Sequence, residues 1–532
     1  MDIPVLIVGA GPAGLSTSIM LSRLSVPSLL VERHAGTSIH PKAMGISLRT
    51  MELLRQWGLD HRVREASVDL RFVNAIRMTT LGSPTVTEAP LGYPDAEASR
   101  LVSPVAPAAI PQDKFEPILL DAARSDPDAE IRFNTELTSL RQDDAGVIAT
   151  IVDRTTTLAT QVRARYLIAA DGFASPVRRE LGIEMRGNGR LGDYISILFR
   201  ANLERFAPAP LCGMYTVRVG DASSILVPSG NGRWVFASPW KGDLDGVPKS
   251  RLVELVTRAI ASTDVAIELL DARTLQIGAE VAERFRDGNV FLVGDSAHRT
   301  TPSGGMGMNT AIHGAHNLAW KIAAVLNGWA GEGLLDSYEL EHRPVAERIV
   351  ARSIGQQREH SPLSVDLGAV YSSAAVVNDD ADATAEIMEP TAPARVGARA
   401  PHVMVKRAGW HRSTTDVTGT RMVLIAPPQA HTWVRDVSDA ARALGVPLEV
   451  TLFTPPCTDV QAARLWRDAY GVAVERAVLV RPDGHIAWIT PATASNPAAL
   501  ASEVLARILD RQSNIGHAFG TTRMRRAQRR SA

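Results

Sequence analysis

Cysteine is scarce in this chain, and its scarcity excludes two kinds of protein. Cys212 and Cys457 are the two cysteines among 532 residues, and their separation gives neither a CxxC pair nor a cluster with the spacing of metal ligands. A disulfide-stabilised scaffold is therefore excluded, no metal site is predicted, and a reducing cytoplasmic compartment is favoured. We expect both cysteines to be small buried hydrophobic residues.

Long apolar runs and an excess of one charge are also lacking. No apolar run in the sequence approaches the ~20 residues that a membrane-spanning helix needs. Because strand-like sequence begins almost at once, a signal peptide is not expected. Lys+Arg and Asp+Glu both number 57, so the formal net charge is zero, and neither a nucleic-acid nor a membrane partner is predicted.

The strongest pattern in the chain lies at its start. An apolar, β-branched run at residues 4–8 leads into Gly9, Gly11 and Gly14, an amphipathic helical segment follows, and a second apolar run at 28–31 ends at Glu32. A strand, a GxGxxG turn, a helix, a strand and an acid in this order are typical of a dinucleotide-binding βαβ unit. The motif by itself leaves FAD and NAD(P) open.

Each residue type in this unit has a physical role. Gly9 permits the tight turn after the strand, Gly11 lets the backbone approach a pyrophosphate, and Gly14 lets the helix pack on the sheet. The N–H groups of the helix N-terminus attract phosphate, and Glu32 can accept hydrogen bonds from ribose hydroxyls. The predicted nucleotide site also includes three neighbours within or beside the unit: Pro12, Ala13 and Arg33.

Two basic residues follow close to the phosphate end of this unit. Lys42 lies in the loop at 39–45, and Arg49 lies in a predicted helix at 47–57. Each could hold a pyrophosphate or a second nucleotide, and each could equally lie on a solvated helix face. We favour a functional role for Arg49 and leave both interpretations open for Lys42.

Two further predicted strands end at residues that could bind a ligand. Asp171 and Gly172 follow a buried run at 166–170, although an ordinary Asp-Gly turn is the plain alternative. Asp295 follows a buried run at 289–293, and a glycine-rich loop then leads into a long helix. Exposed N–H groups at that helix start would stabilise negative charge on a ring such as reduced flavin. The candidate residues in this loop are Pro302, Gly305, Gly307, Met308 and Asn309.

These three motifs, in this order and at these separations, resemble the class A FAD-dependent aromatic hydroxylases with a p-hydroxybenzoate-hydroxylase-like fold. The segments at 397–402, 413–416 and 481–484, with Trp488, are similar to the thioredoxin-like third domain of the branch that contains the aromatic polyketide hydroxylases of antibiotic pathways. The resemblance implies an α/β fold: a Rossmann-like (βαβ) FAD-binding domain, an inserted β-rich substrate domain and a C-terminal thioredoxin-like domain.

Composition and texture suggest where these domains lie. Residues 71–100 share the β-rich texture of 186–274, and Pro and Ala become frequent between 379 and 401. We predict an FAD-binding domain at 1–70, 101–185 and 275–390, a substrate-binding β-sheet domain at 71–100 and 186–274, a thioredoxin-like domain at 395–510, and a disordered tail at 511–532.

The resemblance also implies a mechanism and roles for residues. Glu32 would bind the ADP part of FAD, Arg49 and Gln112 would approach the pyrophosphate and ribityl chain, and Asp295 would hold the ribityl or pyrophosphate region. The loop at 304–309 would contact the flavin pyrimidine edge, and Asp171-Gly172 would serve both FAD and NAD(P)H. NADPH or NADH would reduce the flavin transiently, and O2 would form a C4a-hydroperoxide that oxygenates a polycyclic aromatic substrate. A monomer or a homodimer is expected.

Several alternatives stay open at this point. Ring hydroxylation leads, Baeyer–Villiger insertion is a close variant, and an FAD dehydrogenase or a non-catalytic flavin-loaded binding protein for aromatics represents another class. A base that deprotonates a phenol is expected, but no motif marks one. Tyr215 and Arg71 are weak candidates, with packing or surface roles equally acceptable, and His298 is more readily structural.

The chain also departs from the family pattern. After Asn309 the family usually reads Thr-Gly-Ile-Gln-Asp-Ala, whereas this chain has His313 and Gly314 in place of Gln-Asp. A contact near the flavin would be lost or remade there. The predicted third domain has no CxxC, so an oligomer or lid role is favoured over a redox role.

Overall fold

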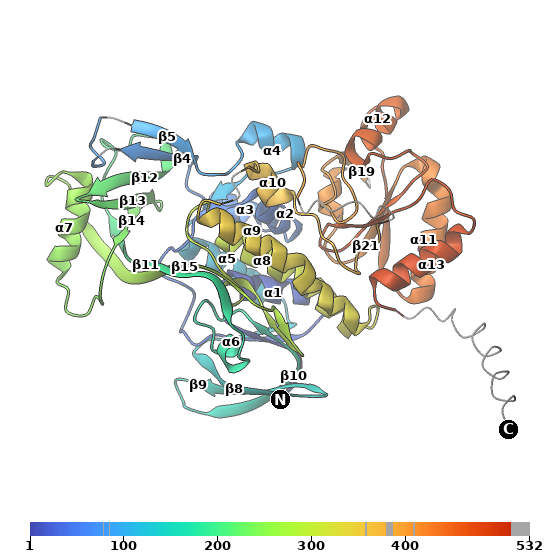
Figure 1. The fold of residues 1–532 in the computed structure, drawn as a ribbon, viewed down its shortest axis with the longest axis horizontal. Helices are drawn as coiled ribbons and strands as arrows, with labels where there is room; N and C mark the ends of the chain where they lie inside the picture. Colours follow the sequence, from blue (N-terminus) through green and yellow to red (C-terminus); the bar gives the residue numbers. More distant parts are fainter. Residues whose placement is uncertain (78, 85, 357–358, 379–386, 408–409, 512–532) are drawn as a thin grey trace, which may run out of the picture.

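The chain forms three sheet-based bodies that lie in a row (Figure 1). A β-sheet carrying one helix lies at one end, a helix-covered domain lies in the centre, and the C-terminal residues form the body at the other end. The computed structural model describes residues 1–511 except 78, 85, 357–358, 379–386 and 408–409. The predicted disordered tail therefore lies, apart from residue 511, outside the described residues.

The central sheet brings the three sequence motifs to one edge. Strands β1, β10 and β17 are parallel neighbours, with Val8 opposite Ala169 and Ala169 opposite Leu292. Because parallel strands end at the same edge, the turns that follow them meet there. The strand order is β16 (Arg286–Asp287), β17 (Val290–Leu292), β10 (Ala159–Ala169), β1 (Asp2–Val8), β2 (Ser28–Val31) and β7 (Ala129–Arg132), with β9 (Gly146–Asp153) also pairing with β10 and β8 (Thr135–Asp143) pairing with β9.

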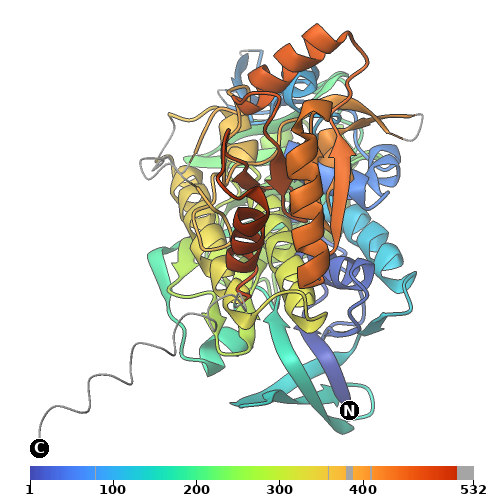
Figure 2. The same ribbon diagram turned by 90° about the vertical axis from the view of Figure 1, so that its right-hand side faces the viewer.

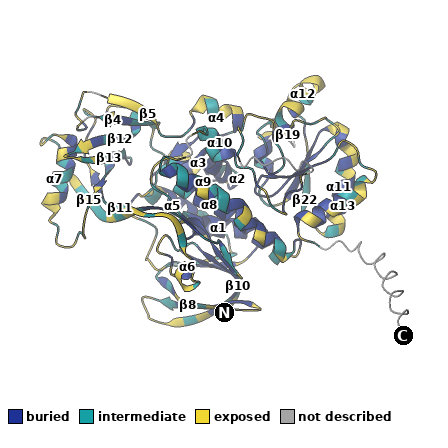
Figure 3. Cartoon of the chain, viewed as in Figure 1, coloured by how far each residue is buried: buried dark blue, intermediate teal, exposed yellow. Residues whose placement is uncertain are grey.

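Helices pack on this sheet, and those that begin at residues 12, 112 and 307 place their N-termini near the same edge. The sheet and the helix faces turned toward it are buried, as the dark interior of Figure 3 shows. Ser47 caps the predicted helix after it by accepting a hydrogen bond from the Thr50 amide, and Asp113 in the first turn of the helix at 112–124 pairs with Arg233. The helices are α1 (Pro12–Arg23), α2 (Leu48–Gln56), α5 (Gln112–Arg124), α8 (Gly307–Leu326) and α9 (Ser337–Ser353).

The second sheet has one face on a helix and the other toward the centre of the molecule. On β11 the alternate residues Ile195, Ile197 and Phe199 are buried in a core with α7, so Ser196 points to the opposite face. The strand order is β18 (His298–Arg299), β15 (Glu268–Ala282), β11 (Met185–Arg200), β14 (Arg233–Pro239), β13 (Ala222–Pro228), β12 (Leu211–Val219), β4 (Leu70–Arg77) and β5 (Val86–Pro90), and α7 spans Lys249–Ile260.

The C-terminal body has the strand order of a thioredoxin fold. The strand order is β22 (Leu448–Leu452), β21 (Met422–Ala426), β23 (Val478–Val480) and β24 (Ile486–Ile489). Strands β22 and β21 are parallel, and the β21–β23 and β23–β24 pairs are antiparallel. Figure 2 shows this body facing the viewer with its helices in front, namely α11 (His431–Leu444), α12 (Asp459–Tyr470) and α13 (Pro497–Ile508). Cys212 is buried, but Cys457 is exposed, so the expectation that both cysteines are buried is wrong for Cys457.

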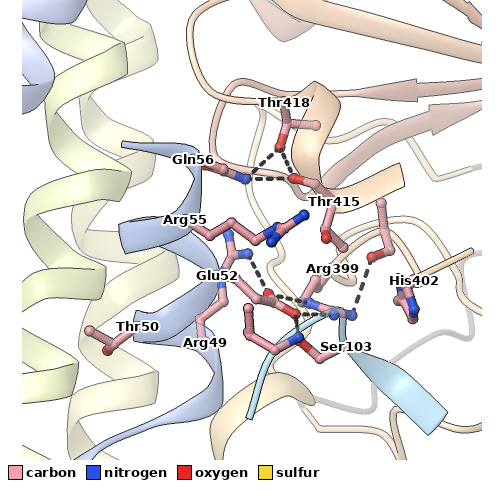
Figure 4. A network of polar contacts seen from close by, with 12 residues as sticks. Arg49, Thr50, Glu52, Arg55, Gln56, Ser103, Arg399, His402, Thr415 and Thr418 are labelled. Atoms are coloured by element: carbon pink, nitrogen blue, oxygen red, sulfur yellow. Dashed lines mark hydrogen bonds and ion pairs between the residues drawn. The ribbon is translucent and has the colours of Figure 1, made fainter. Parts of the chain in front are cut away.

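Buried ion pairs join the C-terminal body to the central domain. Glu52 on α2 accepts hydrogen bonds from Arg49 at 2.9 Å and from Arg399 Nε at 2.9 Å, and the three side chains face one another in Figure 4. A second buried group centres on Glu341, which pairs with Arg481 at 2.5 Å and with Lys321 at 2.6 Å. The Glu52–Arg399 and Glu341–Arg481 pairs cross from one body to the other, so these buried charges are satisfied across the junction.

Short elements complete the described chain. They are β3 (Gly45–Ile46), α3 (Asp60–Glu65), α4 (Ala96–Val102), β6 (Ala108–Ala109), α6 (Pro176–Glu180), α10 (Pro362–Leu367), β19 (Met404–Arg407), β20 (Trp410–Ser413) and four 3-10 turns. Across the described ranges, no helix combines the length and apolar character that a bilayer crossing requires. Nor do those ranges bring three or more His, Cys, Asp or Glu side chains into a metal-binding group.

Candidate active site

A cavity of about 2040 Å³ lies between the edge of the central sheet and the inner face of the second sheet. Sites for one small molecule occupy about 300–1,000 Å³, so this cavity has room for two ligands. One half is lined by the motif turns of the central domain, and the other half by side chains of the second sheet. We call these the motif half and the sheet half.

The start of α1 forms one end of the motif half. A Cβ on Gly9 would stand 2.3 Å from the Ala170 carbonyl oxygen, whereas a Cβ on Gly11 would meet no atom within 4 Å. Gly11 is the N-cap residue of α1, and no side chain caps the helix. The N–H groups of the first turn therefore face open space, an arrangement that binds phosphate.

Glu32 stands beside this turn at the end of β2. Its Oε2 accepts a hydrogen bond from the Ala10 amide at 2.9 Å, and its Oε1 accepts one from the His34 amide at 2.9 Å. These bonds hold the carboxylate at the cavity wall, where its remaining acceptor capacity can meet the hydroxyls of a ribose.

Two aspartates lie farther along the cavity wall. Asp171 Oδ2 accepts from the Val177 amide at 3.1 Å, while its Oδ1 is buried and has no hydrogen-bond partner within the described chain. The enclosing cavity walls raise the pKa of Asp171 and that of Asp295, which is exposed within the cavity, and Lys42 and Arg299 oppose the effect at Asp295. Carboxyl groups in such surroundings gain from hydroxyl or amide donors on a ligand.

The start of α8 forms the other end of the motif half. Met306 is its N-cap residue, and no side chain caps this helix either. Asn309 holds the loop before it: its amide donates to the carbonyls of Gly45 at 3.0 Å and Gly305 at 2.9 Å, and its oxygen accepts from the Ser47 amide at 2.9 Å. The uncapped N–H groups suit an anionic ring edge.

These observations fit FAD. The open space above Gly11 and the uncapped start of α1 suit its pyrophosphate, and the uncapped start of α8 suits the flavin. Most of the predicted site residues line the cavity: Gly9, Gly11, Pro12, Ala13, Glu32, Arg33, Lys42, Gln112, Asp171, Gly172, Asp295, Pro302, Gly305, Gly307 and Met308. Gly14 and Asn309 lie behind its wall, where a Cβ on Gly14 would stand 1.9 Å from the Gly9 carbonyl oxygen.

The structure does not bring Arg49 to this cavity. Its guanidinium is buried, pairs with Glu52 and donates to the Asp483 carbonyl oxygen at 2.6 Å, at the junction with the C-terminal body (Figure 4). The expectation that Arg49 approaches the pyrophosphate is therefore corrected. Lys42, for which function and surface were left open, is the basic residue of the pair that lines the cavity.

Tyr215 and Arg71, the weak candidates for the base, also lie elsewhere. The Tyr215 hydroxyl accepts from the Cys212 amide at 2.9 Å, and its ring packs on Trp234 within the core of the second sheet. Arg71 pairs with Glu88 at the surface. Neither residue lines the cavity. A base role for either is therefore not supported by its position.

A row of hydrogen-bonded polar side chains, which the sequence did not predict, reaches the sheet half. His40 is fully buried, its Nε2 lies 2.7 Å from Ser196 Oγ, and its Nδ1 lies 2.9 Å from Asp271 Oδ2. Asp271 also accepts from Arg273 Nε at 2.8 Å. Ser196 and Arg273 line the cavity. The sequence shows His40 in a loop, but its partners lie 156 and 231 residues away, so nothing local marks the chain.

The predicted departure at His313 and Gly314 lies directly behind the start of α8. His313 Nε2 lies 3.0 Å from Thr50 Oγ1, and a Cβ on Gly314 would stand 2.5 Å from His342 Nε2. The His342 ring therefore occupies the space that an aspartate side chain would need. Burial lowers the pKa of His342 to about 3, so the ring is neutral.

Comparisons with known proteins agree with this geometry. Residues 2–353 match the family model described as FAD binding domain, and residues 393–512 match aromatic-ring hydroxylase, C-terminal. Aklavinone 12-hydroxylase of Streptomyces purpurascens is 37% identical over 96% of this chain and 99% of its own length. Tetracenomycin A2 monooxygenase-dioxygenase of Streptomyces glaucescens is 35% identical over 96% and 98%. A crystal structure of aklavinone-11 hydroxylase with FAD and aklavinone superimposes with a TM-score of 0.87, at 35% identity, over 96% of this chain and 99% of that one.

Proposed function

The chain belongs to the family of FAD-dependent aromatic-ring hydroxylases, and from that premise we propose that it uses NADPH or NADH and O2 to hydroxylate a ring of a polycyclic aromatic polyketide. The observation that carries the proposal is the joined cavity. A motif half that fits FAD opens directly into a sheet half whose walls combine apolar side chains with a few polar groups. Such a lining suits a flat aromatic ligand.

The motif half supplies the cofactor contacts in this proposal. The backbone of Gly9, Gly11, Pro12 and Ala13 holds the pyrophosphate, and Glu32 holds the ribose. Asp295 holds the ribityl or pyrophosphate region. The remaining predicted contacts are Arg33, Lys42, Gln112, Asp171, Gly172, Pro302, Gly305, Gly307 and Met308. When bound, FAD supplies the reduction by NAD(P)H and the activation of O2 that ring hydroxylation needs.

The sheet half orients the ring and excludes water. Its inner face presents Ile225 from β13, Val235 from β14, Leu275 and Ile277 from β15, and Phe72 from β4. These side chains form a dry wall on which an aromatic system can stack, with Ser196 and Arg273 as polar contacts at one place. A fixed ring position selects which carbon receives the oxygen atom.

The decisive test follows labelled oxygen. The holoenzyme is incubated aerobically under 18O2 with NADPH or NADH and a panel of anthraquinone- and naphthacene-type phenols, and the products are analysed by mass spectrometry and NMR. We expect one labelled oxygen atom in a new ring hydroxyl.

Other results would point to the other classes. A labelled lactone would indicate Baeyer–Villiger insertion, and ligand-dependent flavin reduction without label would indicate a dehydrogenase. Ligand binding without consumption of NAD(P)H would indicate a binding protein. A reaction without ligand serves as the control for uncoupled oxidation of NAD(P)H.

A further inference from the structure

The polar chain at the sheet half is built as a path for one proton. Ser196 lines the cavity, His40 lies behind it with no exposed surface, and Asp271 lies behind His40 with 26% of its side chain exposed and outside the cavity lining. The order is therefore cavity, serine, histidine, carboxylate, solvent.

The protonation states follow from the partners. An ionised carboxylate can only accept, so the His40 nitrogen that faces Asp271 is the one that carries hydrogen, and Nε2 accepts from the Ser196 hydroxyl. Burial lowers the pKa of His40, and this effect is opposed by the hydrogen bond to Asp271. Burial alone would raise the pKa of Asp271, but the hydrogen bonds from His40 and Arg273 outweigh it and lower the pKa. A neutral imidazole oriented by a carboxylate is a competent proton acceptor.

The fold sets this geometry through strand register. Ser196 on β11 is the partner of Arg273 on β15, and Asp271 lies two residues away on the same face of β15. Both strands extend from the second sheet to the central domain in Figure 1, and the loop that carries His40 continues from the motif half. The Ser196, His40 and Asp271 side chains thus lie where the two halves of the cavity meet.

We propose that Ser196, His40 and Asp271 form a relay that removes the phenolic proton of the substrate. The inference rests on the proposed function, since it assigns the base that ring hydroxylation of a phenol uses. The phenol O–H proton moves to Ser196 Oγ while the Ser196 proton moves to His40 Nε2, leaving a phenolate and an imidazolium that Asp271 stabilises. Return of the Nε2 proton through Ser196 to the hydroxylated product resets the relay with hydrogen again on Nδ1, and no electrons are exchanged. Lys42 and Arg273 at the cavity wall favour the phenolate by charge.

A spectroscopic titration tests the relay without turnover. Oxidised holoenzyme without NAD(P)H is mixed with 1,8-dihydroxyanthraquinone, whose phenolate absorbs at longer wavelength than the phenol, and the absorbance is followed with pH. We expect bound probe to ionise at lower pH than free probe in the wild type. Ser196→Ala and His40→Asn should move the midpoint back by about one pH unit, a tenfold loss in the ionisation equilibrium.

Matched variants separate the relay from a packing effect. Ser196→Thr keeps the hydroxyl and should retain the wild-type midpoint. Ser224→Ala removes a buried serine hydrogen bond to Ser238 in the same sheet, outside the cavity lining, and should also leave the midpoint unchanged. FAD content and thermal unfolding verify that each variant is folded.

The outcomes differ for the two proposals. Variants that bind the probe and ionise it at the wild-type midpoint would overturn the relay and leave the proposed function standing. A wild type that binds none of the hydroxyanthraquinones would overturn the proposed function and the relay with it. A dimethyl ether of the same probe should bind without the long-wavelength band, because it has no proton to lose.

Discussion

The cavity and the junction with the C-terminal body are both polar, internal and rich in charge, yet they are built in opposite ways. At the junction each charge has a protein partner: Glu52 is held by two arginines and Ser103, and burial, which would raise its pKa, is outweighed so that the pKa falls to about 2 (Figure 4). In the cavity the helix N-termini are uncapped and one Asp171 oxygen has no partner within the described chain.

Polar groups that have protein partners stabilise the fold, and polar groups that lack them are placed to bind a ligand. Most buried polar groups in proteins have hydrogen-bond partners, so uncapped helix starts and an unpartnered oxygen gathered at one cavity wall favour a ligand there. Arg49 and Lys42 illustrate this, because both are basic and both follow the βαβ unit. The Arg49 guanidinium donates its hydrogen bonds to protein groups, whereas Lys42 lines the cavity. Pairing, rather than residue type or motif position, tells the two roles apart.

The largest effect is expected at the junction. Glu341→Gln keeps the side-chain shape but leaves Arg481 and Lys321 without their shared carboxylate, and breaking such a buried group costs about 3–5 kcal/mol of unfolding free energy. Guanidinium unfolding followed by circular dichroism measures it. Glu254→Gln, which breaks an exposed pair with Arg251, serves as the control and should have little effect. Equal changes in the unfolding free energy of the two variants would contradict the structural role of the buried ion pairs at the junction.

The next effect contrasts two glycines three residues apart. Gly14→Ala places a Cβ against the Gly9 carbonyl oxygen and should cost the apoprotein about 3 kcal/mol. Gly11→Ala meets no protein atom, so apoprotein stability should change little while the dissociation constant of FAD rises about tenfold, which is 1.4 kcal/mol. Fluorescence quenching on FAD addition and thermal unfolding of the apoprotein measure the two quantities. An unchanged FAD affinity in Gly11→Ala would contradict the assignment of the α1 start.

A smaller, pH-dependent effect is expected at Asp366 on α10. Burial raises its pKa to about 6, and one of its oxygens lacks a partner within the described chain. Because the folded state binds this proton more tightly than the unfolded state, the stability that it contributes is full below pH ~4 and is lost as the pH rises through 6. Asp366→Asn should therefore stabilise the protein by about 2 kcal/mol at pH 8 and by much less at pH 4. Urea unfolding at both pH values checks the sign, and an equal gain at both would contradict it.

The smallest effect concerns a contact between the two halves of the cavity. The Tyr93 hydroxyl donates to the Gly305 carbonyl oxygen at 2.9 Å and so holds the loop before α8. Tyr93→Phe removes one hydrogen bond, worth about 1 kcal/mol. We expect a dissociation constant for FAD raised severalfold, with thermal stability nearly unchanged. A loss of stability with unaltered FAD affinity would show that Tyr93, like the paired groups of the junction, stabilises the fold and does not support FAD binding.

The sequence predicted what contiguous segments encode. The family and the fold class are confirmed by the matched family models and the superimposed structure. A strand, a glycine turn and a helix form one local signal, so Gly9, Asp171 and Asp295 could be placed at the ends of parallel strands. Side chains that meet through strand register or domain packing give no such signal. Arg49 contacts the Asp483 carbonyl 434 residues away, and Ser196 meets His40 across 156 residues.

The close fit of His342 over Gly314 constrains how this chain can change. An aspartate at position 314 would collide with the ring, so the two positions are coupled and their substitutions are not additive. A replacement of His342 by a smaller residue opens the space first, and Gly314 can then accept a side chain. The reverse order passes through a clash. A side chain at position 314 of α8 therefore requires a smaller residue at position 342 of α9.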